Sequence, residues 1–227
     1  MTLEHPTGPP TSQTPDSLRL QILATEHWSL LASRSLAWNE TWARAGMFLS
    51  TLSGAIVALA LVSQASDFGE SFRLFGLVIL PVVLFVGIGT LFRLDASNYH
   101  DARCVIGMNR IRAAYLELAP ELERYFVMGT TDDERGVLKT MALEENRPFL
   151  PHLISATPFL IATLNSVILA GICALVVLEL GGGRLSAIGV GAVAFVAGQA
   201  LQAAHARRRI EGARGEHVPL FPTGGSS

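Results

Sequence analysis

Four apolar stretches without Asp, Glu, Lys or Arg near their centres constrain this chain more than any other feature of its sequence. They cover residues 45–65, 72–92, 153–178 and 185–204. At a rise of about 1.5 Å per residue, about 20 helical residues cross a hydrocarbon layer of about 30 Å. A backbone exposed to lipid must also satisfy its own hydrogen bonds, which a helix does. The sequence therefore predicts an all-α membrane protein with four transmembrane helices.

The overall composition agrees with membrane insertion. Half of the 227 residues are hydrophobic and only 16% are charged, whereas a soluble domain typically carries about 25% charge. The net charge of −2 offers no basic excess for nucleic acid. Cys104 and Cys173 are far apart in the chain and form no zinc motif. We expect the lipid bilayer as a partner, no nucleic acid and no cofactor.

Short turns and the distribution of arginine predict how the spans are connected. Asp67–Glu70 and Gly181–Gly183 are turns that would close two helical hairpins. The only basic residues at these turns are Arg73 and Arg184. The opposite ends of the four spans are rich in arginine. The arginines beside those ends are Arg34, Arg44, Arg93, Arg103, Arg110, Arg112, Arg135, Arg147, Arg207, Arg208 and Arg209. The positive-inside rule then predicts that both termini and the central segment are cytoplasmic.

The basic residues and the N-terminal segment indicate the source of the chain and how it is targeted to the membrane. Sixteen of the seventeen basic residues are arginine, with Lys139 as the exception. This bias suggests a GC-rich bacterial genome, and so a multi-pass protein of the bacterial cytoplasmic membrane. The first 43 residues lack the basic start and short apolar core of a cleavable signal peptide. We expect the first span to act as the insertion signal.

The remaining segments are predicted to be cytoplasmic. Residues 1–15 read as a disordered tail, and residues 16–43 as an amphipathic cytoplasmic or interfacial helix whose Trp28, Trp38 and Trp42 suit the interface. Hairpins at 44–92 and 152–205 enclose a helical region at 93–151. Residues 206–227 form a C-terminal tail that we expect to be unstructured.

Three signals divide the central region into helices. Its first part, after Arg93, continues the second span as a helix with an apolar stripe. Pro120 begins a new helical turn, which Gly129 ends. Thr131 and Glu134 match a capping box, so a further helix is expected from Asp132 to Glu145. In this interpretation the acidic residues at 132–134 form the first turn of that helix.

Neutral polar residues within the spans are the candidates for a functional site. They include Ser50, Thr51, Thr163, Asn165 and Ser166. Two interpretations stay open for these five residues, the lining of a pore and interhelical hydrogen bonds. No ionisable residue lies near the middle of any span, so a proton relay through the membrane has no groups to use.

Several short segments resemble uncharacterised bacterial four-helix integral membrane proteins. They are SRSLAWNE at 33–40, RAGMF at 44–48, GMNRIR at 107–112 and YLE at 115–117. The resemblance covers most of residues 20–200. It implies a bacterial membrane protein and brings no activity, cofactor or site residue with it.

The sequence contains no recognisable nucleophile, base or metal constellation. We therefore expect a non-enzymatic protein, acting as an oligomeric scaffold or sensor through its cytoplasmic helices. The alternative is an oligomeric channel or pore for ions or small solutes. Both hypotheses allow a homo-oligomer and leave the ligand open.

Overall fold

The computed structural model describes residues 14–141 and 157–224, and within them every regular element is a helix. The predicted disordered tail lies outside the described residues as far as position 13. The elements are α1 (Asp16–Ser66), α2 (Glu70–Leu118), the 3₁₀ helix η1 (Pro120–Tyr125), α3 (Glu134–Thr140), α5 (Thr157–Glu179) and α6 (Arg184–Glu216).

Four of these helices are long and apolar enough to cross a membrane, as predicted from the sequence. They are α1, α2, α5 and the Arg184–Arg209 part of α6. Each contains one of the four predicted apolar stretches, although the first residues of the third stretch lie outside the described residues. The prediction of a multi-pass, all-helical chain is confirmed at this level of length and composition.

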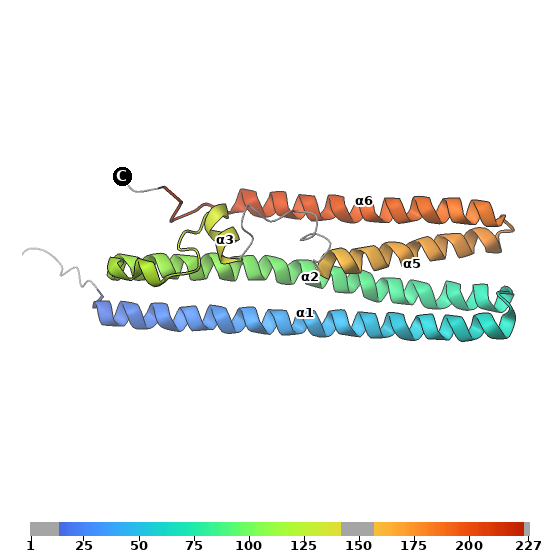
Figure 1. Ribbon diagram of the computed structural model, residues 1–227, viewed down its shortest axis with the longest axis horizontal. Helices are drawn as coiled ribbons and strands as arrows, with labels where there is room; N and C mark the ends of the chain where they lie inside the picture. Colours follow the sequence, from blue (N-terminus) through green and yellow to red (C-terminus); the bar gives the residue numbers. More distant parts are fainter. Residues whose placement is uncertain (1–13, 142–156, 225–227) are drawn as a thin grey trace, which may run out of the picture.

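The four long helices pack in chain order. Helix α1 lies along α2, α2 along α5, and α5 along α6, as Figure 1 shows. A buried apolar cluster joins the first three of these helices. Its central side chains are Phe48 of α1, Val83 of α2 and Ile161 of α5. Toward the end of the molecule where the chain begins, α1 and α2 continue beyond the start of α5.

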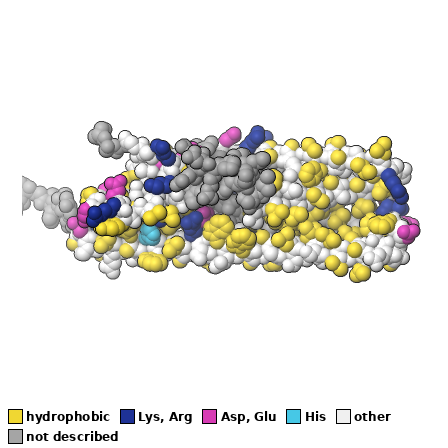
Figure 2. Space-filling model, in the orientation of Figure 1, with side chains coloured by type: hydrophobic (Ala, Val, Ile, Leu, Met, Phe, Trp, Pro, Cys, Tyr) yellow, Lys and Arg dark blue, Asp and Glu magenta, His cyan; other side chains and the backbone are white. Residues whose placement is uncertain are grey.

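We call this projecting part of the α1/α2 pair, residues 16–40 and 94–118, the stalk. On the face of the molecule that Figure 2 shows, hydrophobic side chains cover much of the half away from the stalk. Charged side chains gather on the stalk and at the far end of the molecule. This division matches the expected positions of lipid and water along the α1/α2 pair.

Helix α1 continues without a break from the predicted interfacial segment into the first predicted span. A repeat of seven residues explains this continuity, because it keeps one face of a helix against its neighbour. In α1 the repeat buries Thr41, Phe48 and Ala55. In α2 it buries Gly76, Val83 and Thr90 in one row and Gly87, Leu94, Asp101 and Met108 in a second. One packing seam therefore runs from the membrane segment into the stalk.

Two predictions for the polar regions are wrong. The N-cap of α3 is Asp133, whose side chain accepts the N–H of Gly136, and not Thr131. Helix α3 ends at Thr140, and the predicted continuation over residues 142–145 lies outside the described residues. The C-terminal segment was expected to be unstructured from residue 206. Instead α6 continues to Glu216, and the residues after it pack against the loop before α3.

Candidate functional site

The five polar residues predicted within the spans lie in two separate environments. Ser50 and Thr51 are exposed on the outer surface of α1, and Thr51 Oγ1 donates to the carbonyl of Met47 at 2.9 Å in its own helix. Asn165 and Ser166 are buried on α5, where Thr163 is half-buried. A single chain therefore does not bring the five residues around one lumen.

Thr163 and Ser166 take part in hydrogen bonds between α5 and α6. Gln199 Nε2 donates to Thr163 Oγ1 at 3.2 Å, and Gln202 Nε2 donates to Ser166 Oγ at 2.9 Å. Gly198 allows α5 and α6 to approach closely at this contact, because a Cβ at this position would lie 2.9 Å from Ser166 Oγ. Sequence reasoning missed Gln202, although its position three residues after Gln199 places both amides on one side of the helix.

Asn165 is different because neither polar atom of its side chain has a hydrogen-bond partner. It is 3% exposed and packs against Gly87 of α2, beside the ring of Phe48. A side chain at position 87 would overlap the Asn165 amide and would also come 2.7 Å from Phe48. The contact therefore depends on the glycine and holds α1, α2 and α5 together at one level.

Ion pairs hold the stalk together. Asp101 is buried on α2 and accepts hydrogen bonds from the guanidinium of Arg34 and, at 3.1 Å, from the indole of Trp38. Closer to the membrane segment, Glu40 of α1 pairs with Arg93 of α2. Removing one partner of a largely buried pair is costly, because the other charge remains unpaired.

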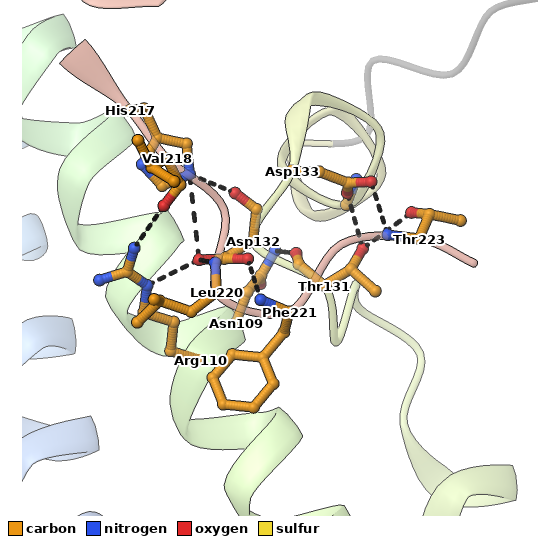
Figure 3. A network of polar contacts seen from close by, with 11 residues as sticks. Asn109, Arg110, Thr131, Asp132, Asp133, His217, Val218, Leu220, Phe221 and Thr223 are labelled. Carbon is orange, nitrogen blue, oxygen red and sulfur yellow. Dashed lines mark hydrogen bonds and ion pairs between the residues drawn. The ribbon is translucent and has the colours of Figure 1, made fainter. Parts of the chain in front are cut away.

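A polar network joins the loop before α3 to the segment that follows α6, and Figure 3 shows its geometry. At its centre is the fully buried side chain of Asp132. Its carboxylate accepts the N–H of Phe221 at 2.7 Å and the N–H of Leu220 at 2.9 Å. Arg110 of α2 donates its Nε to the same carboxylate at 2.7 Å. We call this contact, between residues 131–133 and residues 217–223, the clasp.

A second carboxylate extends the clasp. Asp133 accepts the N–H of Thr223 at 2.8 Å with one oxygen and the N–H of Gly136 at 3.0 Å with the other. Thr131 Oγ1 donates to Asp133 at 2.9 Å. One side chain thus caps α3 and binds the tail.

The sequence of the tail fits this binding through the main chain. Pro219 and Pro222 have no N–H, and the three N–H groups that remain between 220 and 223 all donate to the two carboxylates. His217 adds a side-chain contact, since its Nε2 lies 2.6 Å from the carbonyl oxygen of Asp132. The prolines also restrict the free segment, which lowers the entropy lost on docking.

Buried groups on α2 and α3 fix the loop that carries these carboxylates. Asn109 is fully buried and donates to the carbonyl of Thr131 at 2.8 Å. Its side-chain oxygen accepts from Arg112 at 2.7 Å and from Thr140 at 2.8 Å. Thr140 Oγ1 in turn accepts the N–H of Gly129 at 3.0 Å. The clasp is therefore built on the stalk itself.

The hydrogen bonds of the clasp favour ionised carboxylates. Burial raises the pKa of Asp132, but the N–H groups of Leu220 and Phe221 and the guanidinium of Arg110 lower it by more, so the net shift is downward. Burial likewise raises the pKa of Asp133, and its bonds to Thr223, Gly136 and Thr131 lower it to well below its ordinary range. Both residues act as acceptors at neutral pH.

The prediction that residues 132–134 only form the first turn of a helix missed this network. The clasp links residues about 90 positions apart in sequence, and no local spacing reports such a contact. The only available signal was the apolar, proline-flanked run at 218–222 in an otherwise polar tail. In the part of the chain that the structure describes, no three His, Cys, Asp or Glu side chains are grouped to hold a metal ion.

No protein-family model, curated protein or solved structure matches this chain.

Proposed function

We propose that this chain is a non-enzymatic, oligomeric scaffold or sensor of a bacterial cytoplasmic membrane. In this proposal two helical hairpins cross the bilayer, both termini are cytoplasmic, and the stalk projects into the cytoplasm. The arginine-rich ends of the spans support this orientation. The stalk would carry the function, because the described residues outside the predicted spans are concentrated in and around it.

An apolar surface at the end of the stalk is the observation that carries the proposal. Trp28 is 70% exposed, and Leu20 and Leu31 are also exposed near it on α1. A groove of about 470 Å³ continues this surface between the beginning of α1 and the end of α2, where Leu118 and Phe126 line it. Apolar side chains that project from a stalk into water favour a protein partner. We propose a second copy of the chain as that partner.

The clasp gives such a stalk a means of responding to the membrane segment. Helix α6 contains the fourth predicted span, and its C-terminal extension is fixed to Arg110 on α2 through Asp132. A displacement of α6 would therefore pull on the stalk outside the bilayer. In this proposal the clasp would be closed in one state and open in the other, as a sensor requires.

Cysteine cross-linking of the full chain in membranes tests the self-association. In a Cys104→Ser, Cys173→Ser background, the probe is Ser35→Cys, which is exposed on α1 about two turns from Trp28. The control is Ser29→Cys, which is also exposed but lies about 120° around the helix from position 35. We expect cross-linked dimers from the probe in excess over the control, and their loss when Trp28→Glu is added. Equal or absent cross-linking in both variants would contradict the proposal.

The oligomeric pore remains as the alternative proposal because Ser50 and Thr51 are exposed on α1 within the first predicted span. The Thr51 hydroxyl already donates within its own helix, so this alternative rests on Ser50, whose hydroxyl is better accommodated beside another copy or water than in lipid. Such a pore would lie between chains, and the buried Asn165 would not line it. Ion or solute flux in liposomes that Ser50→Leu reduces would support the pore. Silent liposomes under several ionic conditions would argue against it.

A further inference from the structure

A shallow groove between α1 and α2 lies at the junction of the stalk and the membrane segment. Its volume is about 300 Å³. Ser33, Leu36 and Glu40 line it from α1, and Arg93, Ser97 and His100 line it from α2. The groove thus combines polar donors with an apolar wall, in a region that neither the clasp nor the stalk tip occupies.

The depth of the groove matches the headgroup layer of a bilayer. Arg93 directly follows the second predicted span, and Glu40 lies within two helical turns of the first. Residues 93–100 rise by about 10 Å along α2, while the headgroup layer of one leaflet is about 5–8 Å thick. Trp38 and Trp42 lie at the same level of α1 and stack on each other, as expected for an interfacial aromatic belt.

The charges at the groove do not balance. The carboxylate of Glu40 accepts hydrogen bonds from Arg93 at 2.6 and 3.0 Å and from Arg44 at 3.0 Å. These hydrogen bonds lower the pKa of Glu40, so the carboxylate carries one negative charge against two guanidinium groups. One positive charge is therefore left in this cluster of three side chains beside the groove. The ion pair between Arg73 and Glu179 at the other end of the membrane segment has one partner of each sign.

An apolar path leads from the groove into the membrane segment. On α2, Gly89 lies one helical turn from Arg93 in the direction of the bilayer. A Cβ at Gly89 would meet no atom within 4 Å. Phe85, one turn further, is 79% exposed, and Met47 on α1 is 68% exposed. This surface is open to an acyl chain directly below the arginines.

We propose that the groove is a binding site for one phospholipid of single negative charge. The phosphodiester would lie against Arg93 and Arg44, and the hydroxyl groups of the headgroup against Ser33, Ser97 and His100. One acyl chain would pass over Gly89. The net charge of the lipid equals the charge that Glu40 leaves unneutralised, and the site does not depend on the proposed scaffold function.

Native mass spectrometry of the full chain in detergent tests the site, with phosphatidylglycerol and phosphatidylcholine of equal chain length as probes. One unneutralised arginine predicts that phosphatidylglycerol binds about 5-fold more tightly. Arg93→Gln and Arg44→Gln each balance the charge and should abolish this preference. Glu40→Gln releases a second arginine and should raise the preference to about 25-fold.

The control is Arg73→Gln, which removes an arginine from the same helix at the other end and should leave the preference unchanged. Thermal unfolding of each variant identifies any that does not fold. If Glu40→Gln does not fold, the comparison of Arg93→Gln with Arg73→Gln still decides the proposal. A wild-type chain without preference, or an equal loss in Arg93→Gln and Arg73→Gln, would overturn it. Inorganic phosphate should not displace the lipid; full displacement at millimolar concentration would assign the groove to free phosphate instead.

Discussion

At the scale of single residues, a buried carboxylate organises a segment that the sequence alone does not mark as structured. Asp132 is fully buried and its acceptors are all directed at donors from other parts of the chain. Such a group is stable only while its partners are present, since an unpaired buried charge is costly. The order of residues 217–223 and the ionisation of this residue therefore depend on each other.

Replacing Asp132 should release the tail. Asp132→Ala removes the acceptor for the N–H groups of Leu220 and Phe221 and leaves Arg110 unpaired. A hydrogen bond to a charged group contributes about 1.5–3 kcal/mol, so we expect the docked segment to lose much of its stabilisation. Hydrogen–deuterium exchange should then show fast exchange throughout 217–223. Asp16→Ala, at an exposed acid on the same side of the molecule, should leave this exchange unchanged.

The clasp should also open in acid. The pKa values of Asp132 and Asp133 are lower in the folded chain than their ordinary value of about 4. Their contribution is therefore complete above about pH 4 and is lost as the pH falls through the lowered values. A spin label on Val218→Cys, whose native side chain is 75% exposed, should be immobile at pH 5–7 and mobile in strong acid. With Asp132→Asn added, the label should be mobile at every pH; immobility there would contradict this assignment.

At the scale of elements, sequence reasoning succeeded where structure follows local periodicity. The long apolar stretches identify α1, α2, α5 and α6 because lipid imposes one length and one polarity. The same reasoning divided α1 near residue 43 because composition changes there, whereas its buried face continues across that point through Thr41, Ala45 and Phe48. Helix packing depends on which face is buried, and composition does not report it.

The contacts between distant elements were beyond sequence reasoning for a different reason. The clasp binds the tail mainly through main-chain N–H groups, which every residue except proline possesses. The separation of Ser50 from Asn165 also follows from the way the helices rotate against one another, and not from their depth in the membrane. Both features require the tertiary arrangement.

The contact between α2 and α5 gives a prediction with a control on the same helix. Gly87→Ala would place a Cβ against the Asn165 amide and the Phe48 ring, and such overpacking costs about 1–3 kcal/mol. Gly89→Ala is the control, because a Cβ there meets nothing within 4 Å. We expect the thermal midpoint to fall for position 87 and to hold or rise for position 89. Adding Asn165→Ala to Gly87→Ala should restore part of the loss; strictly additive losses would show that the two residues do not interact.

At the scale of the whole molecule, the helices form a row in chain order, and α2 contacts both α1 and α5. Arg73 of α2 pairs with Glu179 of α5 at the end of the membrane segment far from the stalk, and Arg110 of α2 binds the tail beyond α6 within the stalk. The proposed sensor requires that the stalk lies on the side of the cytoplasm, and the proposed lipid site would then face the cytoplasmic leaflet. Orientation therefore bears on both proposals.

Labelling with a membrane-impermeant maleimide measures that orientation directly. In the Cys104→Ser, Cys173→Ser background, Ser186→Cys reports the turn between α5 and α6, and Ser29→Cys reports the stalk; both positions are exposed. The excess of arginine at the stalk end predicts that intact cells label only position 186 and that position 29 reacts after lysis. Labelling of position 29 in intact cells would place the stalk, the clasp and the arginine-lined groove outside the cytoplasm, against the direction that eleven flanking arginines predict. Equal reaction of both positions after lysis shows that access, and not reactivity, separates them.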